Sequence, residues 1–101
     1  AYVMYNIMEK KLEDPDLWYG EKVLCMEQMI AAVNWLNWKK SDKFKRKQDI
    51  YHNLAELHKK HKCFAEAGRA EIMEKRFAAS LDNMLNYGMK KKSRYEKFFE
   101  R

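Results

Sequence analysis

The sequence predicts an all-α protein, a compact bundle of four to five helices folded as a single domain over residues 1–101. Residues with high helix propensity (Ala, Leu, Met, Glu, Lys, Gln and Arg) fill 57 of the 101 positions. Only seven residues are valine or isoleucine and threonine is absent, although strands favour β-branched side chains. One proline and three glycines also leave little of the turn chemistry that β-hairpins need.

The first helix is predicted over residues 2–13, because Val3 and Ile7 are four positions apart on one helical face. It is expected to end at Asp14 and Pro15. Aspartate is a good helix cap and proline fits the first helical turn, so this pair also predicts the start of a second helix.

The second helix is expected to continue to about residue 38 or 40. Between Val23 and Trp38 its residues are apolar around most of the helix circumference. A helix of this kind has to be surrounded by other elements. We therefore expect the second helix to lie at the centre of the bundle.

A third, basic helix is predicted to open at a cap formed by Ser41 and Asp42 and to run to about Lys62. The segment from Tyr51 to Gly68 resembles one helix pair of the tetratricopeptide family, although it covers under a fifth of the chain and has no second copy. The resemblance implies an αα-hairpin. It rests on Tyr51, Leu54, Ala55, Phe64 and Ala67, and departs from the family pattern at Glu71 and Glu74.

A fourth helix is predicted over residues 65–87, with Gly88 as its C-terminal cap. A short fifth helix would follow over residues 90–101. The apolar stripe of the fourth helix has spacings of three and four and consists of Ala70, Met73, Phe77, Leu81 and Met84.

The net charge of +6 is distributed unevenly along the chain. Residues 1–38 sum to −3 and residues 39–62 to +6, whereas residues 63–89 sum to −1 and residues 90–101 to +4. Positive potential is therefore expected in two blocks, which favours an anionic partner.

Both blocks combine cations with aromatic residues. Lysine neutralises phosphates and aromatic rings stack on exposed bases, so the sequence predicts a non-catalytic nucleic-acid-binding protein. Lysine outnumbers arginine 16 to 5, and arginine is the residue that reads bases, so we expect little sequence specificity. The first block consists of Lys39, Lys40, Lys43, Lys45, Arg46 and Lys47, flanked by Trp35, Trp38 and Phe44; the second contains Lys90, Lys91, Lys92 and Arg94, interleaved with Tyr95, Phe98 and Phe99.

The aromatic content supports an alternative hypothesis, that the protein is an adaptor or inhibitor docking on an acidic or apolar protein surface. Three tryptophans, six tyrosines and five phenylalanines are many for a small bundle to bury. A surplus would form an exposed apolar patch of the kind that marks protein interfaces. Trp35, Trp38, Phe98 and Phe99 would then contact the partner, or a second copy in a homodimer.

No catalytic residue, metal ligand or cofactor is predicted. Arg46 and His52 are six residues apart, a spacing that resembles HEPN-type ribonucleases, but such pairs are common in basic helices. His58, His61 and Cys63 are residue types that bind zinc, yet the three lysines among them disfavour a cation. Histidines partly buried on the apolar stripe explain this pattern more simply.

Membrane insertion and secretion are not expected. The sequence has no run of 18 apolar residues and no basic region followed by an apolar segment at its start. Cys25 and Cys63 lack the spacing of a disulfide framework. We therefore expect reduced thiols and a cytoplasmic location.

Overall fold

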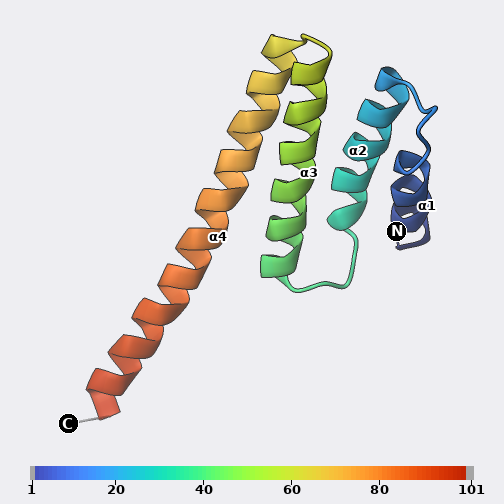
Figure 1. The fold of residues 1–101 in the computed structure, drawn as a ribbon. Coiled ribbons are helices and arrows are strands. Elements are labelled where there is room, and N and C mark those ends of the chain that lie inside the picture. The colour runs from blue at the N-terminus through green and yellow to red at the C-terminus, as the bar shows by residue number, and fades with distance from the viewer. Residues whose placement is uncertain (1, 100–101) are drawn as a thin grey trace.

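The computed structural model consists of four α-helices arranged as an antiparallel row (Figure 1). It describes the backbone of residues 2–99 and the side chains of residues 2–86. The all-α prediction is confirmed, since no strand occurs in the described backbone. The helices are α1 (Tyr2–Leu12), α2 (Tyr19–Val33), α3 (Lys40–Lys60) and α4 (Phe64–Phe99).

The predicted helix end at Gly88 is wrong, because α4 continues past this residue to Phe99 in the described backbone. The separate helix expected over residues 90–101 is accordingly not found, since residues 90–99 belong to α4 and residues 100–101 lie outside the described backbone.

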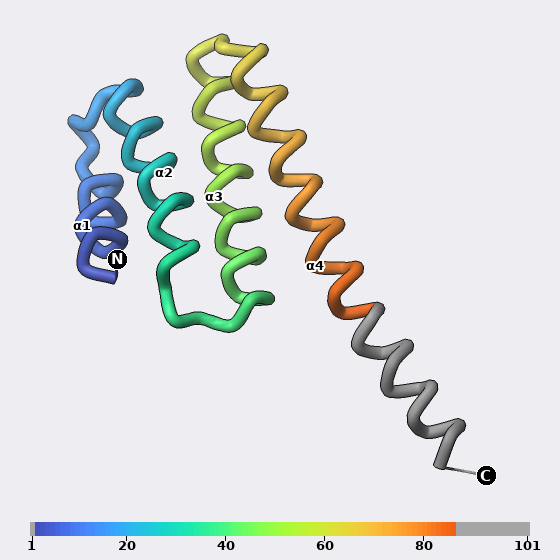
Figure 2. Tube along the Cα trace, turned by 180° about the vertical axis from the view of Figure 1, so that it is seen from behind, coloured from blue at the N-terminus to red at the C-terminus, as the bar shows by residue number. Residues whose placement is uncertain are grey.

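Each helix packs on its neighbours in the chain, so within the described residues the backbone of α2 lies beside α1 and α3 but not beside α4. The view from behind shows the same order (Figure 2). The expected central position of α2 is not confirmed. A row of helices leaves two faces of each inner helix uncovered, and Leu24 of α2 is accordingly 53% exposed.

Helix α2 is shorter than predicted at both ends, and at its start an aspartate favours a turn. Asp14 does not cap it; its Oδ1 instead accepts a hydrogen bond from the backbone N–H of Asp16 at 3.0 Å. Such aspartate turns compete with helix formation. Helix α2 begins after Trp18, without a side-chain cap, and ends at Val33.

The predicted cap of α3 is also displaced. The helix begins at Lys40, so Ser41 and Asp42 lie in its first turn, and the capping position is occupied by Lys39. No side chain hydrogen-bonds the free N–H groups from that capping position. The start of α3 therefore combines unpaired backbone N–H groups, which form the positive end of the helix dipole, with the charges of Lys39 and Lys40.

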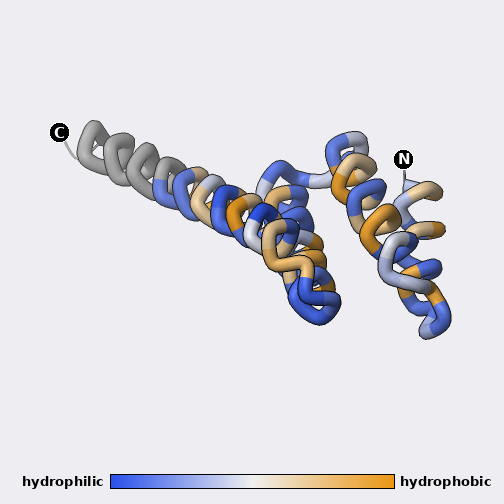
Figure 3. Tube along the Cα trace, turned by 90° about the horizontal axis from the view of Figure 1, so that it is seen from above, coloured by the Kyte–Doolittle hydropathy of each residue, from blue (hydrophilic) through white to orange (hydrophobic). Residues whose placement is uncertain are grey.

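Two clusters of buried side chains hold the row together. The α3–α4 pair forms the predicted αα-hairpin, and from above it lies beside the α1–α2 pair (Figure 3). The first cluster joins α1, α2 and α3, and the second joins α3 and α4. The first consists of Tyr5, Met29, Ala32, Val33, Leu36 and Ile50, and the second of Leu54, Ala55 and Ala70.

Tyr19, the first residue of α2, links the start of this helix to the α3–α4 turn. Its hydroxyl shares a hydrogen bond with Nδ1 of the buried His58, and its ring centroid lies 4.3 Å from that of His61. Hydrogen bonding with the Cys63 side chain, and then burial, raise the pKa of Tyr19 to about 12.

We expect the Tyr19→Phe variant to lose one phenol that ionises at about pH 12 in the folded protein. A raised pKa favours the neutral phenol, so the stabilisation is present below the ordinary pKa of 10.0 and is lost as the pH rises towards 12. The measurement is phenolate absorbance during alkaline titration. If Tyr19→Phe instead removes a phenol that titrates at the ordinary pKa, the interaction with Cys63 is absent.

Candidate nucleic-acid interface

Trp35 projects from the turn between α2 and α3 and is 82% exposed. The turn itself is ordered by backbone hydrogen bonds, from the N–H of Trp35 to the carbonyl of Ala32 at 3.0 Å and from the N–H of Leu36 to the carbonyl of Val33 at 3.2 Å. The next side chain, Leu36, is 4% exposed and anchors the turn in the core. The indole is therefore held outward by a fixed backbone.

Four lysines lie next to this turn. Lys40, Lys43 and Lys47 are spaced by three and four and so share one face of α3, and Lys39 immediately precedes the helix. The Lys43 ammonium donates a hydrogen bond to the Asn34 carbonyl oxygen at 3.1 Å, and the Lys47 ammonium donates to Asn34 Oδ1. These bonds connect the cations to the turn. We call Trp35, Lys39, Lys40, Lys43 and Lys47 the basic corner.

Phe44 supports the basic corner from within the α3–α4 contact. Its ring centroid lies 5.9 Å from that of Phe77 on α4. The Lys40 ammonium lies 5.7 Å from the centre of the Phe44 ring, and the Lys47 ammonium 5.2 Å from the centre of the Phe77 ring. Cation–π attraction of this kind orients the lysines. Phe44, predicted as an interaction residue, is half-buried and packs against Phe77 of α4.

The electrostatics of the basic corner favour an anion. Burial lowers the pKa of Lys47, and the charge of neighbouring Lys43 lowers it further. The positive end of the α3 dipole adds to this potential beside Lys39 and Lys40, and Asp42 in the first turn offsets part of it. A phosphate bound here would relieve the repulsion among the lysines and accept hydrogen bonds from the free N–H groups of the helix.

The other two cations of the first block lie elsewhere. Lys45 forms an ion pair with Asp49 at 3.1 Å, and the Arg46 guanidinium lies 5.7 Å from the ring centre of Tyr5 on α1. Trp38 packs edge-on against the same Tyr5 ring at 5.7 Å, beside the first core cluster. The structure thus separates Lys45, Arg46 and Trp38 from the basic corner.

The second predicted block is not described at side-chain level. Its members lie beyond residue 86, outside the residues with described side chains: Lys90, Lys91, Lys92, Arg94, Tyr95, Phe98 and Phe99.

The residues considered for metal binding or RNA cleavage have other contacts. His52 Nδ1 lies 3.0 Å from Glu74 Oε1 on α4, whereas the Arg46 guanidinium lies against Tyr5 of α1, so the two side chains point away from each other towards different helices. Within the described part of the chain, no three histidine, cysteine or acidic residues converge to hold an ion. Both cysteines are free thiols, with Cys25 buried and Cys63 half-buried.

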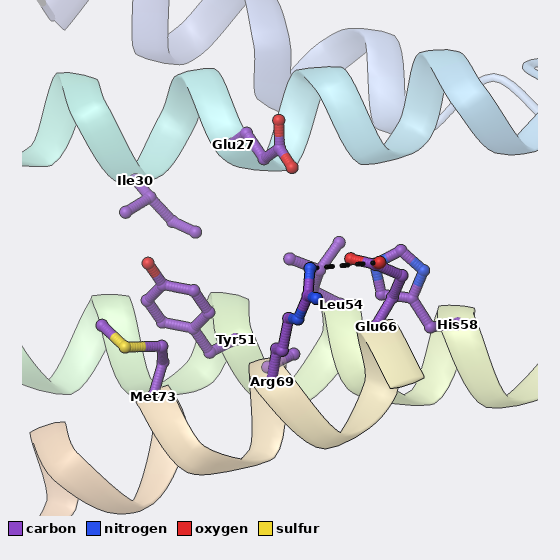
Figure 4. Close-up of a pocket in the computed structure, with 9 residues that line it drawn as sticks. Glu27, Ile30, Tyr51, Leu54, His58, Glu66, Arg69 and Met73 are labelled. Carbon is purple, nitrogen blue, oxygen red and sulfur yellow. Dashed lines mark hydrogen bonds and ion pairs between the residues drawn. The ribbon is translucent and has the colours of Figure 1, made fainter. Parts of the chain in front are cut away.

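Sequence reasoning did not anticipate a groove between α2, α3 and α4 with a volume of about 320 Å³ (Figure 4). Which helices are neighbours decides where a groove forms, and periodicity does not give that order. Side chains from all three helices point into it. We call it the three-helix groove; it is lined by Glu27 and Ile30 of α2, by Tyr51, Leu54 and His58 of α3, and by Glu66, Arg69, Ala70 and Met73 of α4.

No protein-family model matches this chain, and no curated protein or solved structure does. None of the helices, over the residues the structure describes, has the length and apolar character needed to cross a membrane. The fold and the basic corner define the class as an all-α protein with a cationic, aromatic surface at the turn between α2 and α3. The function is therefore inferred from the chemistry of that surface.

Proposed function

We propose that this protein binds single-stranded nucleic acid, without catalysis and with little sequence specificity, through the basic corner. The observation that carries the proposal is the outward-held Trp35, 82% exposed, next to Lys39 and to three lysines that share one face of α3. A large aromatic side chain fixed in water is costly for solubility and suits a surface that stacks on a flat ligand.

The two kinds of side chain divide the recognition. An unpaired base can stack on the indole of Trp35, and any base can do so because every base has a π-face. The lysines neutralise the phosphates on either side of that base. Lysine is a point charge and lacks the planar fork with which arginine reads guanine. The basic corner thus favours a single strand over a duplex, whose bases are already stacked, and discriminates little among sequences.

Reversing two charges with the Lys39→Glu/Lys40→Glu variant is expected to weaken binding of a short single-stranded oligonucleotide by at least about tenfold. The slope of log affinity against log salt should become shallower by about 1.4, at about 0.7 for each lost contact. Fluorescence anisotropy across a salt series measures both quantities. Glutamates at this position also favour the dipole of α3, so the fold should be retained.

The matched control is Lys60→Glu/Lys62→Glu, which makes the same change in net charge at the opposite end of α3. It is expected to change affinity only through the weak, screened long-range field. Equal losses in the two variants would mean that overall charge, and not the basic corner, determines binding.

The alternative, a protein-interaction module, is favoured by a different surface. Val3 on α1 is 71% exposed, and Met4 and Ile7 are exposed beside it. This apolar face lies on α1, an outermost helix of the row, whereas the basic corner lies at the α2–α3 turn (Figure 1).

A further inference from the structure

Helix α1 has two apolar faces, and only one of them is covered. Tyr5 packs into the first core cluster towards α2, whereas Val3, Met4 and Ile7 face away from the core and are exposed. Lys11 follows Ile7 by four positions and so continues the same face with a positive charge. We call Val3, Met4, Ile7 and Lys11 the outer face of α1.

The three-helix groove is complementary to the outer face of α1, because it has an apolar end and an acidic end. Ile30, Tyr51 and Met73 make one end apolar, and the other end contains the carboxylates of Glu27 and Glu66 (Figure 4).

The two carboxylates differ in their partners. Glu66 Oε1 lies 3.4 Å from Nη1 of Arg69 and forms an ion pair with it, whereas Glu27 forms no ion pair with any residue in the described part of the chain. The groove therefore has an apolar end, an acidic end, and one carboxylate available to a cation.

The spacings of the two surfaces also agree. Ile7 and Lys11 are four residues apart, which is about 6 Å along a helix, and Ile30 and Glu27 are three residues apart, about 4.5 Å. A helix lying along the groove could therefore place Ile7 at the apolar end and Lys11 beside Glu27. Within one chain this is excluded, since α1 is fixed on the far side of α2 from the groove.

We propose that the outer face of α1 docks in the three-helix groove of a second copy of this chain. The apolar side chains bury against Ile30, Tyr51 and Met73, and Lys11 pairs with Glu27, as in other complexes where an amphipathic helix fills a groove. None of the residues involved belongs to the basic corner, so self-association leaves that surface free.

A charge exchange tests the proposal. Lys11→Glu and Glu27→Lys each place like charges in contact, and each is expected to weaken self-association by about tenfold or more, as measured by sedimentation velocity. An equimolar mixture of the two variants restores opposite charges at every contact between unlike chains. The mixture, and the double variant Lys11→Glu/Glu27→Lys, are both expected to associate with nearly the affinity of the unmodified chain.

Circular dichroism of each variant checks that the helices are retained. We expect them to be retained, because both substituted positions are exposed. Three outcomes would overturn the proposal. The unmodified chain could remain monomeric at about 1 mM; Lys11→Glu could weaken association while Glu27→Lys does not, which would indicate that α1 pairs with another α1; or the mixture could fail to recover association.

Discussion

Truncation of Leu54 to alanine is expected to lower the free energy of unfolding by about 2–5 kcal/mol. Leu54 is 5% exposed and belongs to the second core cluster, where Val23 and Met26 of α2 pack against it. Its buried companions Ala55 and Ala70 are too small to fill the cavity that the truncation leaves.

Leu54 also connects α2 to the α3–α4 hairpin, because Val23 and Met26 of α2 pack against the cluster to which it belongs. In a small domain with a stability of about 5–15 kcal/mol, such a loss is a large share of the total. Urea unfolding followed by circular dichroism measures it. The control is Leu24→Ala, at a position 53% exposed, which should change stability by about 0.5 kcal/mol or less. Equal effects of the two truncations would contradict the described core.

Truncation of Trp35 to alanine is expected to weaken binding of a single-stranded oligonucleotide by about 1–3 kcal/mol, roughly 5- to 150-fold in affinity. The indole is 82% exposed and the turn is anchored by the buried Leu36, so stability should change by about 0.5 kcal/mol or less. Anisotropy titration and urea unfolding of the same sample separate the two effects.

Trp18→Ala is a matched control. Trp18 is 70% exposed and precedes α2 at the opposite end from the basic corner, and its indole N–H donates to Glu21 Oε1 at 2.7 Å. Its loss is expected to leave oligonucleotide affinity unchanged. A similar loss of affinity in both tryptophan variants would show that Trp35 has no special role in stacking.

The sequence was sufficient to predict the helices themselves and the α3–α4 hairpin, because these depend on local propensity and on periodicity along one segment. The caps were less predictable. Asp14 and Ser41 are both good capping residues, but Asp14 forms a turn of its own and Ser41 lies one position inside α3. Local signals of this kind are satisfied by more than one backbone conformation.

The arrangement in space was the part that periodicity could not give. An α2 that is apolar around its circumference predicted a central helix, yet the row leaves Leu24 in solvent. The same limit applies to the site. Trp35 and Trp38 were predicted together as interaction residues of one helix. Helix α2 ends at Val33, so both lie in the turn that follows, where Trp38 packs against Tyr5 and Trp35 points outward.

Sorting the first basic block likewise required the neighbouring helices. Lys45 and Arg46 are adjacent to Lys47 in sequence, but one pairs with Asp49 and the other contacts α1. The three-helix groove, whose walls come from three separate segments, left no signal in any single segment.

The most direct measurement is the affinity of the unmodified protein for a short single-stranded oligonucleotide as the salt concentration is raised. Contacts from the four lysines of the basic corner predict a slope of about −2.8 in log affinity against log salt, at about 0.7 for each phosphate contact, with a duplex of the same length binding more weakly. An absence of binding at low salt, or an affinity that does not change with salt, would contradict the proposed function.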